Sequence, residues 1–137
     1  MTTPIWLQTL QNSADQSTKA FAGKLGLPAF ARTVDAINRS PSLQQDIIDY
    51  ATGTGRFEGR GIGRFGIDER NIDTGGYYTI DPTGGAETSL VVVGSDRLAG
   101  VYQGVINPAA DAALVLAHEI KHAFSRADIN NLPSAVD

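Results

Sequence analysis

Apolar residues in the first third of the chain recur at helical spacing, with polar residues between them. The first of these runs predicts an amphipathic helix over about residues 4–22, which Gly23 and Gly26 would stop. Its apolar stripe consists of Trp6, Leu10, Ala14, Phe21 and Leu25.

Two further helices are expected before residue 53. Pro28 can open a short helix that runs to Asn38, because proline is well tolerated in the first helical turn. A Ser-Pro pair in "RSPSLQQDIIDYATG" starts the next helical run, and Gly53 ends it. We expect these helices to pack as one layer over residues 1–52.

Between residues 53 and 106 the pattern changes to short β-prone runs separated by glycines. Three of them, "RFEGRGIGRFGI", "GYYTIDP" and "TSLVVVG", predict three or four short strands. Polar and apolar residues alternate in "GYYTID", whereas "LVVV" is apolar throughout and indicates a strand buried on both faces. The strands would form a small twisted sheet.

Helical spacing returns over residues 107–126. Asn107 can cap this helix, Pro108 follows at its first position, and Asp111 lies in the early turns, all of which favour a helix N-terminus. One side is apolar and would anchor the helix in the core, with Leu116, Ile120, Ala123 and Phe124. The expected fold is therefore α+β, with N-terminal helices, a small twisted sheet and a C-terminal helix.

Length and composition narrow the class of protein. The 137 residues, of which 42% are hydrophobic, suit one domain over 1–137. A net charge of −4 gives no whole-chain attraction to nucleic acid or to an anionic membrane, so neither is an expected partner. The N-terminus lacks the pattern of a signal peptide, and the apolar runs are too short to span a bilayer. We expect synthesis in the cytoplasm, which is compatible with delivery by a specialised secretion system.

Both histidines of the chain lie in the final predicted helix, within "LAHEIKHAF". Residues four apart on a helix are about 40° apart around its axis, so His118 and His122 can hold one metal ion. Glu119 lies beside the pair, where it can act as general base on a metal-bound water. Because the chain has no cysteine, the metal must be held by His, Asp or Glu. This HExxH pattern predicts Zn²⁺ and peptide-bond hydrolysis.

A catalytic zinc ion normally has three protein ligands, and no third histidine exists in the chain. Asp128, six residues after His122, is the candidate for the third. The run "HEIKHAFSRAD" resembles the extended metzincin pattern HExxHxxGxxH, in its variant ending in Asp, with Ser125 in place of the glycine. Alternative ligands are the upstream acids Asp81, Glu87 and Asp96.

The motif resembles that of the zincin-like metallopeptidases. In particular, "LAHEIKHAF" is similar to the LAHELxHA signature of the NleD-like effector and toxin peptidases of bacteria, with Ile120 in the leucine position. The resemblance implies a zincin-like fold and a zinc endopeptidase that acts on a protein in another cell. His118 and His122 would be ligands and Glu119 the base. An inhibitory or immunity protein is a further candidate partner.

The resemblance also implies how a substrate would bind. In zincins an edge strand pairs with extended substrate, and "SLVVVG" or "YYTID" is the expected counterpart here. A tyrosine could stabilise the oxyanion, although core packing is the commoner role of tyrosine, and the candidates are Tyr77, Tyr78 and Tyr102.

Two other patterns compete with this interpretation. The run "GIGRFG" at residues 61–66 fits GxGxxG, but the polar run after it does not open a helix as a dinucleotide site requires. A row of four arginines could bind an anionic partner or pair with nearby acids on a solvated strand face. The arginines are Arg56, Arg60, Arg64 and Arg70, and the acids are Glu58, Asp68 and Glu69.

A second class of function also stays open. The chain could be a zincin-shaped binding module without catalysis, or the N-terminal fragment of a longer effector. An intact Glu119 favours the enzyme, because a general base is useful only for hydrolysis.

Overall fold

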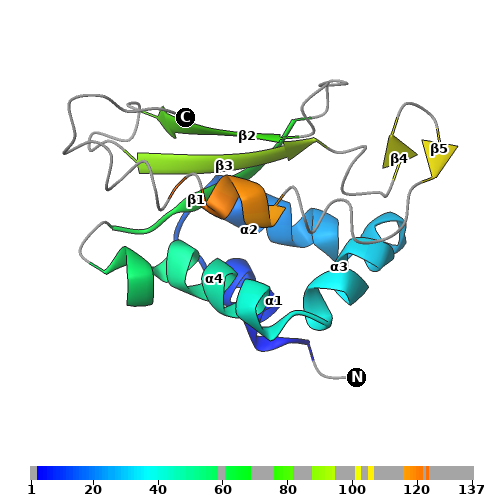
Figure 1. Cartoon of the computed structure of the whole chain (residues 1–137), viewed down its shortest axis with the longest axis horizontal. Coiled ribbons are helices and arrows are strands. Elements are labelled where there is room, and N and C mark those ends of the chain that lie inside the picture. Colours follow the sequence, from blue (N-terminus) through cyan, green and yellow to red (C-terminus); the bar gives the residue numbers. More distant parts are fainter. Residues whose placement is uncertain are drawn as a thin grey trace.

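The fold is α+β, with helices in the N-terminal part of the chain and a mixed sheet after them (Figure 1). This computed structural model describes residues 3–58, 61–68, 76–81, 88–94, 101–102, 105–106, 116–121 and 123, with the backbone alone at 76–81, 88–89, 94, 101–102 and 105–106. The helices are α1 (Ile5–Gln11), α2 (Gln16–Leu25), η1 (Pro28–Phe30), α3 (Ala31–Asn38), α4 (Pro41–Thr52) and η2 (Gly55–Phe57). The strands are β1 (Arg64–Asp68), β2 (Gly76–Asp81), β3 (Thr88–Gly94), β4 (Val101–Tyr102) and β5 (Val105–Ile106). Residues 116–121 and 123 are also helical and are called the C-terminal helical segment.

The apolar run that predicted one helix over residues 4–22 forms two helices, so that prediction is wrong. α1 ends at Gln11, and Asp15 caps the start of α2 by accepting a hydrogen bond from the backbone N–H of Thr18. The hydroxyls of Ser17 and Thr18 donate to the same carboxylate. These local bonds compete with a continuous helix. Gly23, which was expected to stop the helix, lies inside α2.

The other two N-terminal helices are confirmed. Pro28 opens the 3₁₀ turn η1, which leads into α3, and α3 ends at Asn38. At the start of α4 the side chain of Ser40 accepts a hydrogen bond from the backbone N–H of Leu43. Gly53 ends α4 with a φ of 68°, in the left-handed region where glycine has no steric cost.

β3 is the central strand of a three-stranded sheet whose order is β1-β3-β2. It pairs in parallel with β1 and antiparallel with β2. Val91, Val92 and Val93 of β3 are all buried, although successive side chains of a strand point to opposite faces. The prediction of a strand buried on both faces is therefore confirmed for these residues. β4 and β5 form a separate antiparallel pair that no predicted run had indicated.

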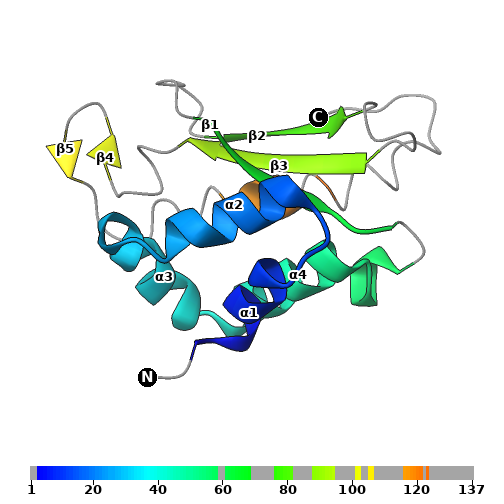
Figure 2. The same ribbon diagram turned by 180° about the vertical axis from the view of Figure 1, so that it is seen from behind.

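Three layers are visible in Figures 1 and 2. The sheet forms the first layer. α2 and the C-terminal helical segment lie at one level beneath it. The segment is in front in Figure 1, and α2 is in front in Figure 2. α1 and α4 form the layer below, and α1 contacts both α2 and α4. The core draws on all three layers, with Trp6, Phe21, Ile47, Val91 and Leu116 among its members. None of the described helices is long and apolar enough to cross a membrane.

A row of aromatic rings connects the sheet to the helices below it. The ring of Phe65 on β1 stacks on Phe21 of α2, with centroids 5.0 Å apart, and lies edge-to-face with Tyr50 of α4 at 5.1 Å. Tyr50 in turn lies edge-to-face with Phe57 of η2 at 5.3 Å. Gly63 lies so close to Tyr50 that a Cβ there would overlap the ring. One glycine of "GIGRFG" is thus required by packing, and the run leads into β1 rather than into a helix.

Candidate functional site

The C-terminal helical segment is anchored by its apolar side, as the sequence predicted. Leu116, Ile120 and Ala123 are 0%, 3% and 3% exposed and belong to the central core. Phe124, the fourth residue of the predicted stripe, lies outside the described residues. The segment lies beneath the sheet and above α4 (Figure 1), so the part of the HExxH motif that it carries is held between two layers.

His118 and Glu119 have different surroundings on this segment. His118 is exposed, whereas Glu119 is buried with 7% of its surface exposed. Successive residues of a helix are about 100° apart around its axis, so His118 lies opposite the buried stripe and Glu119 lies at the border of the stripe. Both residues take part in further interactions, so neither is isolated.

The predicted metal centre is only partly covered by the structure. His122 and Asp128 lie outside the described residues, as does Ser125, and their roles stay predictions. Within the part of the chain that the structure describes, no three His, Asp or Glu side chains gather closely enough to hold a metal ion. Of the predicted ligands the structure describes His118 alone, whose exposed imidazole is a nitrogen donor of the kind that Zn²⁺ binds.

For the remaining candidate ligands and oxyanion donors, the structure describes either the backbone alone or nothing. Asp81 is the last residue of β2 and is paired in register with Thr88. Its side chain, and Glu87 and Asp96 as a whole, lie outside the described residues. The same holds for the side chains of the candidate oxyanion donors, Tyr77 and Tyr78 of β2 and Tyr102 of β4.

β2 is the strand whose edge an extended peptide could join. The alternative, "SLVVVG", is β3, which pairs on both of its sides, so the expectation that it forms an edge is wrong. β2 carries "YYTID" and, among the described strands, pairs with β3 alone. Of the two strands that the resemblance offered, β2 is therefore the one at the edge of the described sheet.

A small pocket lies beside the C-terminal helical segment. Its volume is about 230 Å³. It is lined by Asp46 of α4, Arg56 and Phe57 of η2, and Ala117, Ile120 and Lys121 of the segment. The sequence patterns missed this pocket, because they show which residues share a helix face but not which element packs on that face. The one local signal was the spacing of Ala117 and Lys121, which are four residues apart and so share a flank.

Two of the four arginines in the row pair with acids of the N-terminal helices. Nε of Arg64 lies 2.9 Å from Oδ1 of Asp15, and Nη1 of Arg56 lies 3.4 Å from Oδ1 of Asp46. The other members of the row and one of its acids, Arg60, Arg70 and Glu69, lie outside the described residues. At least two arginines of the row therefore form ion pairs within the fold.

No protein-family model, curated protein or solved structure matches this chain.

Proposed function

We propose that this chain is a zincin-like domain that hydrolyses a peptide bond of a protein substrate, as a bacterial effector or toxin peptidase. His118 and His122 would hold Zn²⁺ with Asp128 as third ligand, and Glu119 would be the general base. One observation carries the proposal: a single anchored helical segment holds an exposed His118 next to a buried Glu119.

Each of these two side chains suits its role. An exposed imidazole can accept a metal ion from solvent while the apolar side of the helix stays in the core. A carboxylate among packed residues is held in one orientation, and the exclusion of water strengthens its electrostatic interactions. Glu119 would take a proton from the attacking water and pass it to the leaving amine. The ion would supply the Lewis acidity that polarises the peptide carbonyl.

The outer edge of β2 would orient the substrate. An extended peptide can add to a sheet edge through main-chain hydrogen bonds, which hold the backbone whatever the side chains are. The proposal assigns this role to β2 because β3 has no free side.

Metal content tests the proposal. Protein purified without added metal or a His tag should contain about one zinc ion per chain by mass spectrometry, as a single catalytic site requires. His118→Ala should contain none. Lys121→Ala changes an exposed neighbour on the same segment that is not a ligand, and it should keep the zinc. A native chain that binds no zinc, even when zinc is offered in excess, would exclude the peptidase and favour the non-catalytic binding module.

Turnover then tests the role of Glu119. Glu119→Gln keeps the shape of the side chain but cannot accept the proton, so it should retain zinc and lose activity by a factor of about 10²–10⁴. Peptide-library cleavage by native and variant protein measures this loss. Full proteolysis by the variant would rule out Glu119 as the base.

A further inference from the structure

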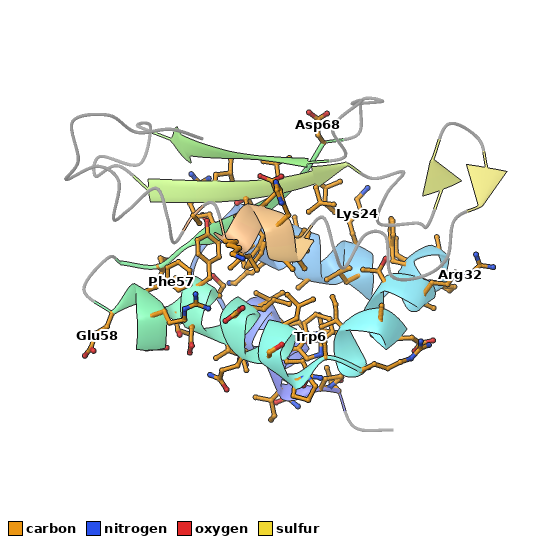
Figure 3. All side chains as sticks on the ribbon, in the orientation of Figure 1. Trp6, Lys24, Arg32, Phe57, Glu58 and Asp68 are labelled. Atoms are coloured by element: carbon orange, nitrogen blue, oxygen red, sulfur yellow. The ribbon has the colours of Figure 1, made fainter. Side chains whose placement is uncertain are left out.

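The pocket between α4, η2 and the C-terminal helical segment has an apolar floor. Phe57 and Ile120 are 5% and 3% exposed, and together with Ala117 they form this floor. Figure 3 shows Phe57 directed toward the interior of the molecule, whereas the neighbouring Glu58 points outward. The Tyr50 ring packs edge-to-face on Phe57, which keeps the floor in place.

Among the residues that the structure describes, the other lining residues carry a net positive charge. Arg56 and Lys121 contribute two positive charges and Asp46 one negative charge. The whole chain has a net charge of −4, so a locally positive pocket stands out from its surroundings. An anionic ligand is therefore attracted to the pocket more than to the rest of the surface.

Arg56 can bind an anion without losing its present partner. Its Nη1 lies 3.4 Å from Oδ1 of Asp46, and the two side chains are 54% and 33% exposed. An exposed ion pair at this distance is weak. A guanidinium has five N–H donors, so it can bind a carboxylate and still contact Asp46. The exposed ammonium of Lys121 adds further donors at the same pocket.

The volume of about 230 Å³ restricts the ligand to a small one. A cavity of about 150 Å³ accommodates benzene, whereas pockets for drug-sized molecules span roughly 300–1,000 Å³. The space therefore matches one aromatic or branched aliphatic side chain together with a small polar group.

We propose that this pocket binds an apolar amino-acid residue that carries or adjoins a carboxylate. The apolar side chain would contact Phe57, Ala117 and Ile120, and the carboxylate would contact Arg56 and Lys121. Neither His118 nor Glu119 is among the described residues that line the pocket, and Ala117 and Lys121 lie on a different flank of the segment from Glu119. The role of the pocket would be to anchor a peptide substrate at a second place. This role rests on the proposed function, but the binding itself needs no metal.

Titration of the isotope-labelled full chain with three probes, followed by NMR, tests the proposal. The chain is the metal-free Glu119→Gln variant, so that neither zinc nor turnover affects the result. N-acetylphenylalanine should shift the backbone amide signals of Phe57, Ala117, Ile120 and Lys121. N-acetylphenylalaninamide, which lacks the charge and so loses the contacts to both Arg56 and Lys121, should bind about 25-fold more weakly. N-acetyl-Phe-Asp-amide distinguishes two sources of the carboxylate: binding as tight as the free acid assigns an internal acidic residue, and weaker binding assigns a chain end.

Variants of the pocket residues supply the controls. Arg56→Gln and Lys121→Gln should each weaken binding of the free acid by about fivefold. Arg32→Gln removes another exposed arginine, at the far end of the molecule from Phe57 (Figure 3), and should leave the affinity unchanged. Ala117→Phe should block the pocket with all charges intact.

Two results would overturn the proposal. One is the absence of shifts at the pocket residues up to the solubility limit of the free acid. The other is equal affinity for the acid and the amide. Neither result bears on the zinc content of the native chain, so the pocket and the peptidase can fail independently.

Discussion

Nε of Arg64, the first residue of β1, lies 2.9 Å from Oδ1 of Asp15, the residue that caps α2. The two positions are separated by 49 residues in the sequence. Thr18 donates to Asp15 through its N–H and its hydroxyl, and the same hydroxyl accepts a hydrogen bond from the backbone N–H of Phe65. One carboxylate thus ties the start of a helix to the start of a strand.

The charge of Asp15 should make the stability of the fold depend on pH. Burial raises the pKa of Asp15, but hydrogen bonds from Ser17 and Thr18 and the charge of Arg64 outweigh it, so the pKa lies below its usual value. Because the folded pKa is lower than the unfolded one, Asp15 stabilises the fold above about pH 4. That contribution is lost as the pH falls through the folded pKa.

Asp15→Asn isolates this effect, because asparagine still caps a helix but carries no charge. Urea unfolding at a series of pH values, followed by the fluorescence of the single tryptophan, Trp6, gives the free energy of unfolding. The native chain should lose stability more steeply toward acid than the variant does. Parallel pH profiles would show that the charge of Asp15 does not contribute.

Gly63→Ala should destabilise the fold by about 1–3 kcal/mol, the usual cost of overpacking. The added Cβ would overlap the ring of Tyr50, which is 1% exposed and packs against both Phe57 and Phe65. Gly66→Ala is the matched control, because its Cβ would lie 3.5 Å from Leu90, in ordinary contact. That change should be neutral or stabilise by up to about 1 kcal/mol, since glycine is unfavourable inside a strand. Equal losses in both variants, measured by thermal unfolding, would contradict the role of Gly63.

His118→Ala should leave the stability of the metal-free chain unchanged to within about 0.5 kcal/mol, as is usual for an exposed position. Leu116→Ala on the same segment should cost about 2–5 kcal/mol, because Leu116 is fully buried. Chemical denaturation of the two variants measures the difference. If His118→Ala proved as destabilising as Leu116→Ala, a loss of zinc in that variant would no longer report on ligation.

Asn38→Ala should cost about 1–3 kcal/mol, because it leaves a buried donor without its partner. The indole N–H of Trp6 on α1 donates to Oδ1 of Asn38 on α3 over 2.8 Å, and Trp6 is 1% exposed. Asn12→Ala, at an exposed asparagine, is the control and should change stability by less than about 0.5 kcal/mol. The emission maximum of Trp6 in the folded state gives a second measure, because loss of the bond alters the surroundings of the indole. An unchanged stability and spectrum would show that the bond adds nothing.

The sequence predicted those elements that are determined by neighbouring residues. α4 starts and ends where Ser40 and Gly53 indicate, because capping and left-handed backbone are local properties. The break between α1 and α2 was missed, because the apolar spacing continues across it. The cap that Asp15 forms with Ser17 and Thr18 starts α2 at this break, although the apolar pattern gives no sign of it.

The site shows the same division. His118 and Glu119 could be found from spacing alone, since both lie on one helix, and the burial of Leu116 and Ile120 followed from the same periodicity. The pocket could not be found in this way, because Asp46 and Arg56 come from elements that meet Lys121 only in the folded chain. For the same reason no local pattern showed that β3 is the centre of the sheet.

The central strand of the sheet is also the last of its three strands to be synthesised. In the described sheet β1 and β2 each pair with β3 and not with each other, so both lack a neighbour until residues 88–94 have left the ribosome. Contacts between such distant segments slow folding. Meanwhile the helices around Trp6 and Tyr50 can already pack, which leaves two unpaired strands on a partly folded chain. The synthesis of β3 therefore ends the period in which neither of these two strands has its partner in the sheet.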